Sequence, residues 1–169
     1  MSKLKSVVED FAKEREFEQV LNDRDGFSLT LVDPLDLVAT QGQMIVELDA
    51  DERVIDTFIY YDLECKDSVR REVIELIHEI HQRWSFGRFE LLSNGGLRWC
   101  YRLDTIGLEI SVDALKQITG TGYYAASMFS LAIDEVVNQG RATEDVMRDF
   151  DEANEKARRE ADGIRTSMR

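Results

Sequence analysis

The sequence has 169 residues, of which 43% are hydrophobic and 33% are charged. This composition is that of a globular protein and excludes disorder of the whole chain, and a chain of this length can bury a core without a disulfide or a metal. Its 34 acidic and 21 basic residues give a net charge of −13, which repels nucleic acid. We therefore expect no direct binding to nucleic acid.

The first half of the chain predicts one helix and then a series of strands. Apolar residues at helical spacing indicate a helix over residues 2–23, which Asp25-Gly26 ends. Alternating apolar residues then predict strands at residues 27–31, 44–48 and 54–61. Asp33-Pro34 is expected to end the first of these strands. The acidic turn 49–52 is short enough to join the last two strands as a hairpin.

The second half predicts helices on either side of a second hairpin. Apolar spacing indicates a helix over residues 69–84, and Asn94-Gly95 provides the positive-φ residues of a tight hairpin turn between 89–92 and 97–101. Residues 108–110 are expected to be extended. Ser111 is a good cap for a long helix that Gly140 stops, and Thr143 opens a last helix.

This order of elements predicts an α+β fold, with helices packed on an antiparallel sheet. We expect a domain over residues 1–140 and a C-terminal helical extension over residues 141–169. Cys65 and Cys100 are the only cysteines and do not form a CxxC pair, which favours free thiols in a reducing cytoplasm. Cys65, near a predicted helix start, is expected to be the more reactive thiol.

Localisation is predicted from what the sequence lacks. The first ten residues have no apolar core like that of a secretory signal. No apolar run approaches the roughly 20 residues needed to cross a bilayer. We therefore expect a cytoplasmic protein with no membrane association.

The segment Gly87-Arg-Phe-Glu-Leu-Leu-Ser-Asn-Gly-Gly-Leu-Arg-Trp-Cys-Tyr-Arg-Leu103 resembles the signature hairpin of the YbjN family of small bacterial proteins. The stretch Leu108–Leu115 also resembles the family's short segment before its next helix, and the likeness covers residues 17–139. The family is similar in fold to type III secretion chaperones, which are small, acidic and usually dimeric. The resemblance therefore implies a homodimeric, non-catalytic protein-binding module, with links to stress response and regulation.

No motif in the chain indicates catalysis, a metal or a cofactor. His78 and His81 lie three residues apart, so the sequence around them is not HExxH. Gly120-Thr-Gly122 lies inside a predicted helix, where close packing or a kink explains it better than a phosphate loop does. The acidic turn 49–52 lacks the spaced ligands and glycine of a calcium loop. We expect neither an enzyme nor a cofactor.

The negative charge is concentrated in one segment. Residues 27–66 carry nine acids and two bases, which gives −7, whereas residues 141–169 carry eight acids and seven bases, which gives −1. Solubility explains such a surface, and so does recognition of a basic client, such as a nucleic-acid-handling protein. The candidate partner-binding residues are Asp49, Asp51, Glu52, Asp56, Asp62 and Glu64.

The last helix has a narrow apolar stripe, which suits a helix lying against another helix. Its candidate self-association or arm residues are Met147, Phe150, Ala157 and Ile164. The stripe fits docking on its own domain, a dimer arm or a client-binding arm.

A second hypothesis is a regulator that senses a small ligand in a groove between sheet and helix. Its candidate lining residues are aromatic, a type that more often belongs to the core, and they are Trp99, Tyr101, Tyr123 and Tyr124.

Overall fold

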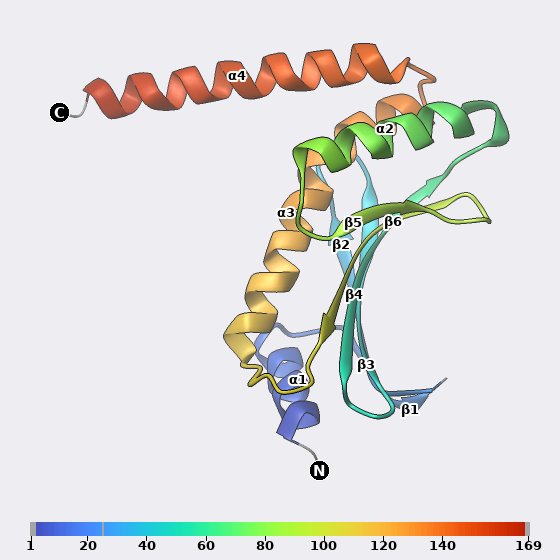
Figure 1. Cartoon of the computed structure of the whole chain (residues 1–169), viewed down its shortest axis with the longest axis vertical. Coiled ribbons are helices and arrows are strands. Elements are labelled where there is room, and N and C mark those ends of the chain that lie inside the picture. The colour runs from blue at the N-terminus through green and yellow to red at the C-terminus, as the bar shows by residue number, and fades with distance from the viewer. Residues whose placement is uncertain (1–2, 25, 168–169) are drawn as a thin grey trace.

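The computed structural model describes residues 3–24 and 26–167, and side chains over residues 3–22 and 26–161. The helices and strands follow one another in the order shown in Figure 1. They are α1 (Lys3–Glu14), β1 (Gln19–Arg24), β2 (Phe27–Asp36), β3 (Gln41–Asp49), β4 (Val54–Glu64), α2 (Arg70–Arg83, after a 3₁₀ turn at Asp67–Val69), β5 (Arg88–Leu91), β6 (Gly96–Asp104), α3 (Val112–Val137) and α4 (Thr143–Ser167).

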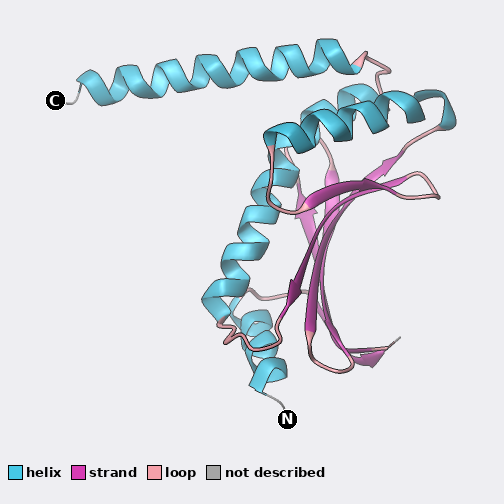
Figure 2. Cartoon of the chain, in the orientation of Figure 1, coloured by secondary structure: helices cyan, strands magenta, loops and turns pink. Residues whose placement is uncertain are grey.

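Within the described residues, six strands form one sheet in the order β1-β2-β3-β4-β6-β5. Every neighbouring pair is antiparallel. The helices cover one side of this bent sheet, as Figure 2 shows. Helix α3 packs on β4 and β6, α1 packs on α3 and β2, and α2 packs on β5 and α3. The predicted α+β class is therefore confirmed.

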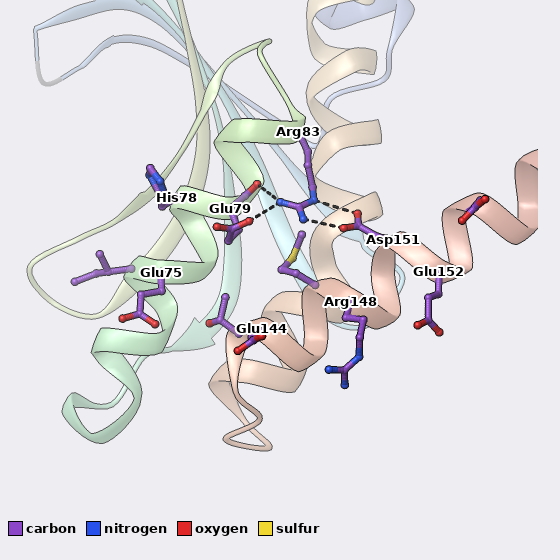
Figure 3. Close-up of a pocket in the computed structure, with 12 residues that line it drawn as sticks. Glu75, His78, Glu79, Arg83, Glu144, Arg148, Asp151 and Glu152 are labelled. Carbon is purple, nitrogen blue, oxygen red and sulfur yellow. Dashed lines mark hydrogen bonds and ion pairs between the residues drawn. The ribbon is translucent and has the colours of Figure 1, made fainter.

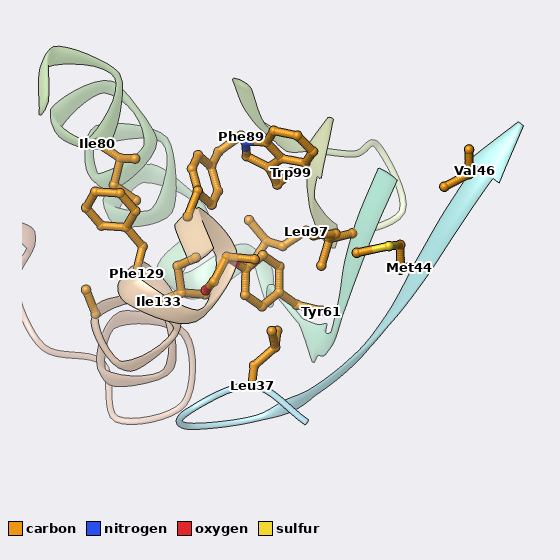
Figure 4. Close-up of a cluster of buried hydrophobic side chains, with 14 of the residues drawn as sticks. Leu37, Met44, Val46, Tyr61, Ile80, Phe89, Leu97, Trp99, Phe129 and Ile133 are labelled. Carbon is orange, nitrogen blue, oxygen red and sulfur yellow. The ribbon is translucent and has the colours of Figure 1, made fainter. Parts of the chain in front are cut away.

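The core lies between the sheet and α3, because alternate residues of each strand point to that side. On β3, for example, Met44, Val46 and Leu48 are buried while the residues between them are partly exposed. Figure 4 shows this cluster, in which Tyr61 also lies. The Tyr61 hydroxyl donates a 2.9 Å hydrogen bond to the Ala126 carbonyl on α3, which joins sheet and helix.

Trp99, on β6, is fully buried between two glycines. A Cβ atom on Gly122 of α3 would lie 2.4 Å from the Trp99 ring, and one on Gly87 would lie 2.3 Å from it. Gly87 also has φ +69°, which few other residues adopt. The close-packing interpretation of Gly122 is therefore confirmed.

The predicted hairpin and the Ser111 cap are also confirmed, although of Asn94 and Gly95 only Gly95 has a positive φ. Strands β5 and β6 pair around a turn in which Gly95 has φ +87°, and the Asn94 side-chain oxygen accepts a 3.1 Å hydrogen bond from the Gly96 N–H. The Ser111 hydroxyl oxygen accepts a 3.2 Å hydrogen bond from the Ala114 N–H at the start of α3.

The prediction of one helix over residues 2–23 is wrong. Helix α1 ends at Glu14, where the Glu16 N–H donates to Lys13 O (3.3 Å) and the Phe17 N–H donates to Ala12 O (3.1 Å). With Glu16 at φ +54°, this pattern is a Schellman motif, which stops a helix. Residues 19–24 instead satisfy their backbone groups by pairing with β2.

Strand boundaries also differ from the prediction, since β2, β3 and β4 are each longer than the predicted 27–31, 44–48 and 54–61. Pro34 does not break β2 but pairs with Gln43 of β3. Strand β1 reaches only to Val32, so Pro34 lies where β2 is an edge and needs no N–H on that side. Residues 108–110, expected to be extended, form no strand.

Candidate functional site

Helix α4 docks on the domain through its first two turns. The Thr143 N–H donates to the Glu72 carboxylate (2.9 Å), and the Thr143 hydroxyl donates to the Glu72 carbonyl (2.8 Å). Met147 is buried, and Phe150 stacks on Phe129 of α3 with ring centroids 4.9 Å apart. The first part of the predicted stripe therefore packs on its own domain.

The Arg83 side chain at the end of α2 makes a second set of contacts between α2 and α4. Its guanidinium donates to both carboxylate oxygens of Asp151 (3.1 and 2.8 Å) and to Glu79 (2.7 Å), as Figure 3 shows. These bonds, to Asp151 first, raise the pKa of Arg83, and the bond from Arg83 lowers the pKa of Asp151. Because Thr143 meets Glu72 and Asp151 meets Arg83, α2 and α4 run side by side in the same direction.

Beyond Asp151, α4 leaves the body of the protein. Every described side chain from residue 151 to 161 is exposed. Figure 1 shows this part of α4 running past the end of α2 and away from the sheet. The 17 residues from Asp151 to Ser167 extend roughly 25 Å at the usual helical rise. We call this part of α4 the overhang.

A groove of about 850 Å³ lies between α2 and α4, and we call it the acidic groove. Ile74, which is 54% exposed, and Met147 give it an apolar lining. Six carboxylates and two arginines, Arg83 and Arg148, also line it, which gives a formal charge of −4. The carboxylates are those of Glu75, Glu79, Glu144, Asp151, Glu152 and Glu155.

The charges of the acidic groove are only partly paired within the described residues. Arg83 is held by Glu79 and Asp151, and Arg148 pairs with Asp145 at 2.6 Å. Glu144 and Glu152 make no ion pair with any residue that the structure describes. The groove therefore combines exposed apolar surface with uncompensated negative charge.

A second groove, of about 590 Å³, continues along α4 under the overhang, and we call it the overhang groove. Arg83 and Asp151 line both grooves, so the ion pair between them marks the boundary of the two grooves. Its walls are mainly apolar and aromatic, with Trp84 and Tyr124 in ring contact at 6.0 Å. The other apolar residues that line it are Met128, Phe129, Phe150, Ala157 and Ala161.

The six predicted partner-binding carboxylates do not form one patch. Asp49, Asp51 and Glu52 lie at the β3–β4 turn, whereas Asp62 and Glu64 lie at the opposite end of β4. The Asp49 carboxylate accepts hydrogen bonds from two backbone N–H groups after the turn (2.6 and 2.7 Å). Asp51, Asp62 and Glu64 are exposed.

Asp56 already has a partner within the sheet. It is 8% exposed and forms a two-bond ion pair with Arg102 at 2.8 and 2.7 Å. Its carboxylate therefore stabilises the β4–β6 pairing and is already paired within the chain.

Some of the predicted arm residues pack on the domain, whereas another is exposed to solvent. Met147 and Phe150 pack on the domain, whereas Ala157 is exposed and lines the overhang groove. The side chain of Ile164 lies outside the described residues.

The four aromatic residues proposed to line a ligand groove do not form one wall, although Trp99 and Tyr101 stack with ring centroids 6.4 Å apart. Trp99 is in the core, and Tyr101 stacks on Phe86 with centroids 4.5 Å apart. The Tyr123 hydroxyl donates to the Asp36 carbonyl (3.0 Å), while Tyr124 lines the overhang groove.

The prediction that Cys65 is a reactive thiol is not supported by its surroundings. Cys65 and Cys100 are each 5% exposed, and burial raises the pKa of both thiols. Cys65 lies before the short 3₁₀ turn at Asp67–Val69, not at the start of α2, so no helix N-terminus stabilises its thiolate.

The contribution of α2 to the acidic groove was missed by the sequence reasoning. Glu72, Glu75 and Glu79 recur at the three- and four-residue spacing of a helix, so they share one side of α2. That signal was present in the sequence. Nothing local indicated that this side would lie beside α4, because that contact depends on the packing of both helices.

Two further properties concern the described part of the chain. His, Cys, Asp and Glu side chains nowhere gather there in groups of three or more that could hold a metal ion. Among residues 3–24 and 26–167, no helix has both the length and the apolar character needed to span a bilayer.

Comparison with known proteins gives a likeness in fold. No protein-family model matches the sequence, and no curated protein matches it. Among solved structures, the chain is similar to a chain in the structure of the HopA1–SchA chaperone–effector complex. The TM-score is 0.47 with 15% identity, over 71% of this chain and 86% of that chain.

Proposed function

We propose that this protein binds another protein and that the acidic groove between α2 and α4 receives a basic, amphipathic segment of that client. The observation that carries this proposal is the combination of exposed Ile74 with a formal charge of −4 in a groove of about 850 Å³. A segment with an apolar side and a basic side satisfies both properties at once.

The energetics favour a client helix or turn over a single charged group. Ion pairs at an exposed surface contribute only about 0.2–1 kcal/mol each, so several carboxylates together give modest affinity and salt-sensitive selectivity. Apolar contact with the exposed Ile74 adds stabilisation that salt does not screen. Nucleic-acid-handling proteins remain fitting clients, because their surfaces carry such basic segments.

The test uses a fluorescein-labelled helical peptide with lysines on one side and leucines on the other. Anisotropy measures its binding to the parent chain and to a groove variant that removes three charges, Glu75→Gln/Glu144→Gln/Glu152→Gln. The matched control removes three charges from exposed carboxylates of the β3–β4 turn and the far end of β4, Asp51→Asn/Asp62→Asn/Glu64→Gln. Both variants have the same net charge, so only the position of the lost charges differs.

We expect the groove variant to bind at least roughly tenfold more weakly, and the control to bind within about twofold of the parent. Ile74→Ser is expected to weaken binding by a further, salt-independent amount. Equal weakening by both triple variants would refute the groove and leave only a general effect of net charge. Affinity capture from lysate with the parent chain and the groove variant then identifies clients that depend on this site.

A further inference from the structure

Three arginines gather on the side of the sheet that faces away from the helices. Trp99 of β6 lies in the core, so its neighbour Cys100 points to the opposite side. Arg98 and Arg102 share that side with Cys100, because each lies two residues from it along β6. Arg88 of β5 pairs directly with Cys100. The three arginine side chains therefore start around one point of the sheet.

A hollow of about 350 Å³ lies among these side chains, and we call it the arginine hollow. The buried Cys100 and the half-buried Phe58 also line it. Of the described carboxylates, Asp56 lines the hollow, whereas its β3 neighbour Glu47 does not. Sites for small ligands usually have volumes of about 300–1,000 Å³, so the hollow is large enough to hold one.

The arginines of the hollow outnumber the carboxylates that pair with them. Arg88 and Arg98 both donate to Glu90, at 2.6 and 2.8 Å. Arg102 donates to both carboxylate oxygens of Asp56, at 2.8 and 2.7 Å. Three cations and two carboxylates give the cluster a formal charge of +1, whereas the whole chain carries −13. One more anion therefore suits this cluster.

The two outer arginines keep hydrogen-bond donors for a ligand, since a guanidinium has five N–H donors. Arg88 reaches its carboxylate through Nε alone, and Arg102 uses Nε and Nη2. Both Nη atoms of Arg88 and Nη1 of Arg102 thus donate to no oxygen of the described residues. These two side chains are 68% and 71% exposed. Arg98 is 22% exposed and lies 4.5 Å from the Phe58 ring centroid, which fixes its charge in place.

The arrangement of these donors favours phosphate over carboxylate. Arg88 and Arg102 are diagonal neighbours on β5 and β6, with Cα atoms about 7–8 Å apart, so their guanidinium groups approach a ligand from two directions. A carboxylate has two oxygens in one plane and matches one guanidinium group. A phosphate group has three acceptor oxygens and can bridge two guanidinium groups.

We propose that the arginine hollow binds a phosphate group, which Arg88 and Arg102 bridge and which the fixed charge of Arg98 attracts. The space beside Phe58 and Tyr101 accommodates the molecule that carries the phosphate. The hollow lies on the side of the sheet opposite α2 and α4 (Figure 2), so phosphate binding is independent of the client groove.

The test follows binding by NMR of the ¹⁵N-labelled full chain, at constant ionic strength and neutral pH. Inorganic phosphate, titrated to roughly 30 mM, is expected to shift the Arg98 Nε–H signal saturably, with a dissociation constant on the order of 1 mM. Arg88→Gln is expected to weaken binding roughly tenfold. Arg71→Gln is the matched control, because Arg71 is also exposed and pairs with one glutamate through Nε (2.9 Å). It is expected to bind within about twofold of the parent.

Arg102→Lys is the second variant, and it keeps a cation beside the buried Asp56 so that the sheet remains intact. Because lysine lacks the planar fork, phosphate binding is still expected to weaken by about fivefold or more. Acetate is expected to bind the parent at least about fivefold more weakly than phosphate. The proposal would be overturned by a parent with no saturable shift, by full affinity in Arg88→Gln, by equal weakening in Arg71→Gln, or by acetate binding as tightly as phosphate.

A pentapeptide with phosphoserine between alanines identifies what carries the phosphate. Tighter binding of this peptide than of inorganic phosphate would assign the hollow to a phosphorylated protein segment. Binding no tighter than that of inorganic phosphate would assign it to a small phosphate compound. The same titrations on the variant Glu75→Gln/Glu144→Gln/Glu152→Gln are expected to match those of the parent within about twofold, because those residues lie outside the hollow.

Discussion

Two glycines on the same helix are expected to respond to alanine in opposite ways. Gly120 and Gly122 lie two residues apart in α3, and replacing either by alanine removes the helix penalty of glycine, about 1 kcal/mol. At Gly120 a Cβ atom would meet nothing within 4 Å. Gly120→Ala is therefore expected to stabilise the protein by up to about 1 kcal/mol.

At Gly122 the same methyl group has no room. Its Cβ would lie 2.4 Å from Cζ3 and 2.7 Å from Cη2 of Trp99, about an ångström closer than ordinary contact. The indole cannot move aside, because Gly87 presses against its other side. Overpacking of this kind costs about 1–3 kcal/mol, and the severity of the overlap places Gly122→Ala near the upper end. After the gain in helix propensity, a net loss of about 2 kcal/mol is expected.

The assay is urea unfolding of the parent and both variants, followed by circular dichroism and tryptophan fluorescence. A Gly122→Ala protein as stable as the parent would refute the packing described for Trp99. A second check is Trp99→Phe combined with Gly122→Ala. Because the smaller ring leaves space for the methyl group, the two free-energy changes should not add, and their sum should exceed the loss in the double variant.

Three further predictions concern single side chains. Tyr61→Phe removes the hydrogen bond to the Ala126 carbonyl and should lower the free energy of unfolding by about 0.5–1.5 kcal/mol with an unchanged urea m-value, whereas no change would count against that bond. Burial, followed by the charges of His78 and Arg88, lowers the pKa of His81 below its usual 6.5. Its contribution to stability should therefore be present above about pH 6.5 and be lost as pH falls through the folded-state pKa, and an NMR titration midpoint at or above 6.5 would contradict this. Cys65 and Cys100 should react with a thiol reagent far more slowly in the native than in the unfolded protein, and fast native labelling would show that one is accessible.

The parts of this protein that the sequence determines by itself are those held by local interactions. The β5–β6 hairpin follows from Asn94-Gly95 and the alternation beside it, and the start of α3 follows from Ser111, because each signal lies within a few residues of the structure it specifies. The docked part of the α4 stripe, at Met147 and Phe150, was likewise visible as an apolar helical pattern.

Only the tertiary structure decided the features that depend on distant partners. Residues 19–24 form a strand because β2 pairs with them, and Pro34 is accepted within a strand because β1 does not reach it. The Asp56 carboxylate forms an ion pair with Arg102, a residue 46 positions away in the sequence. The acidic groove likewise exists because α4 lies beside α2. Its charges were readable in the sequence, but their common location required the contacts of Thr143 and Arg83, since contacts between distant residues leave no periodic signal in the chain.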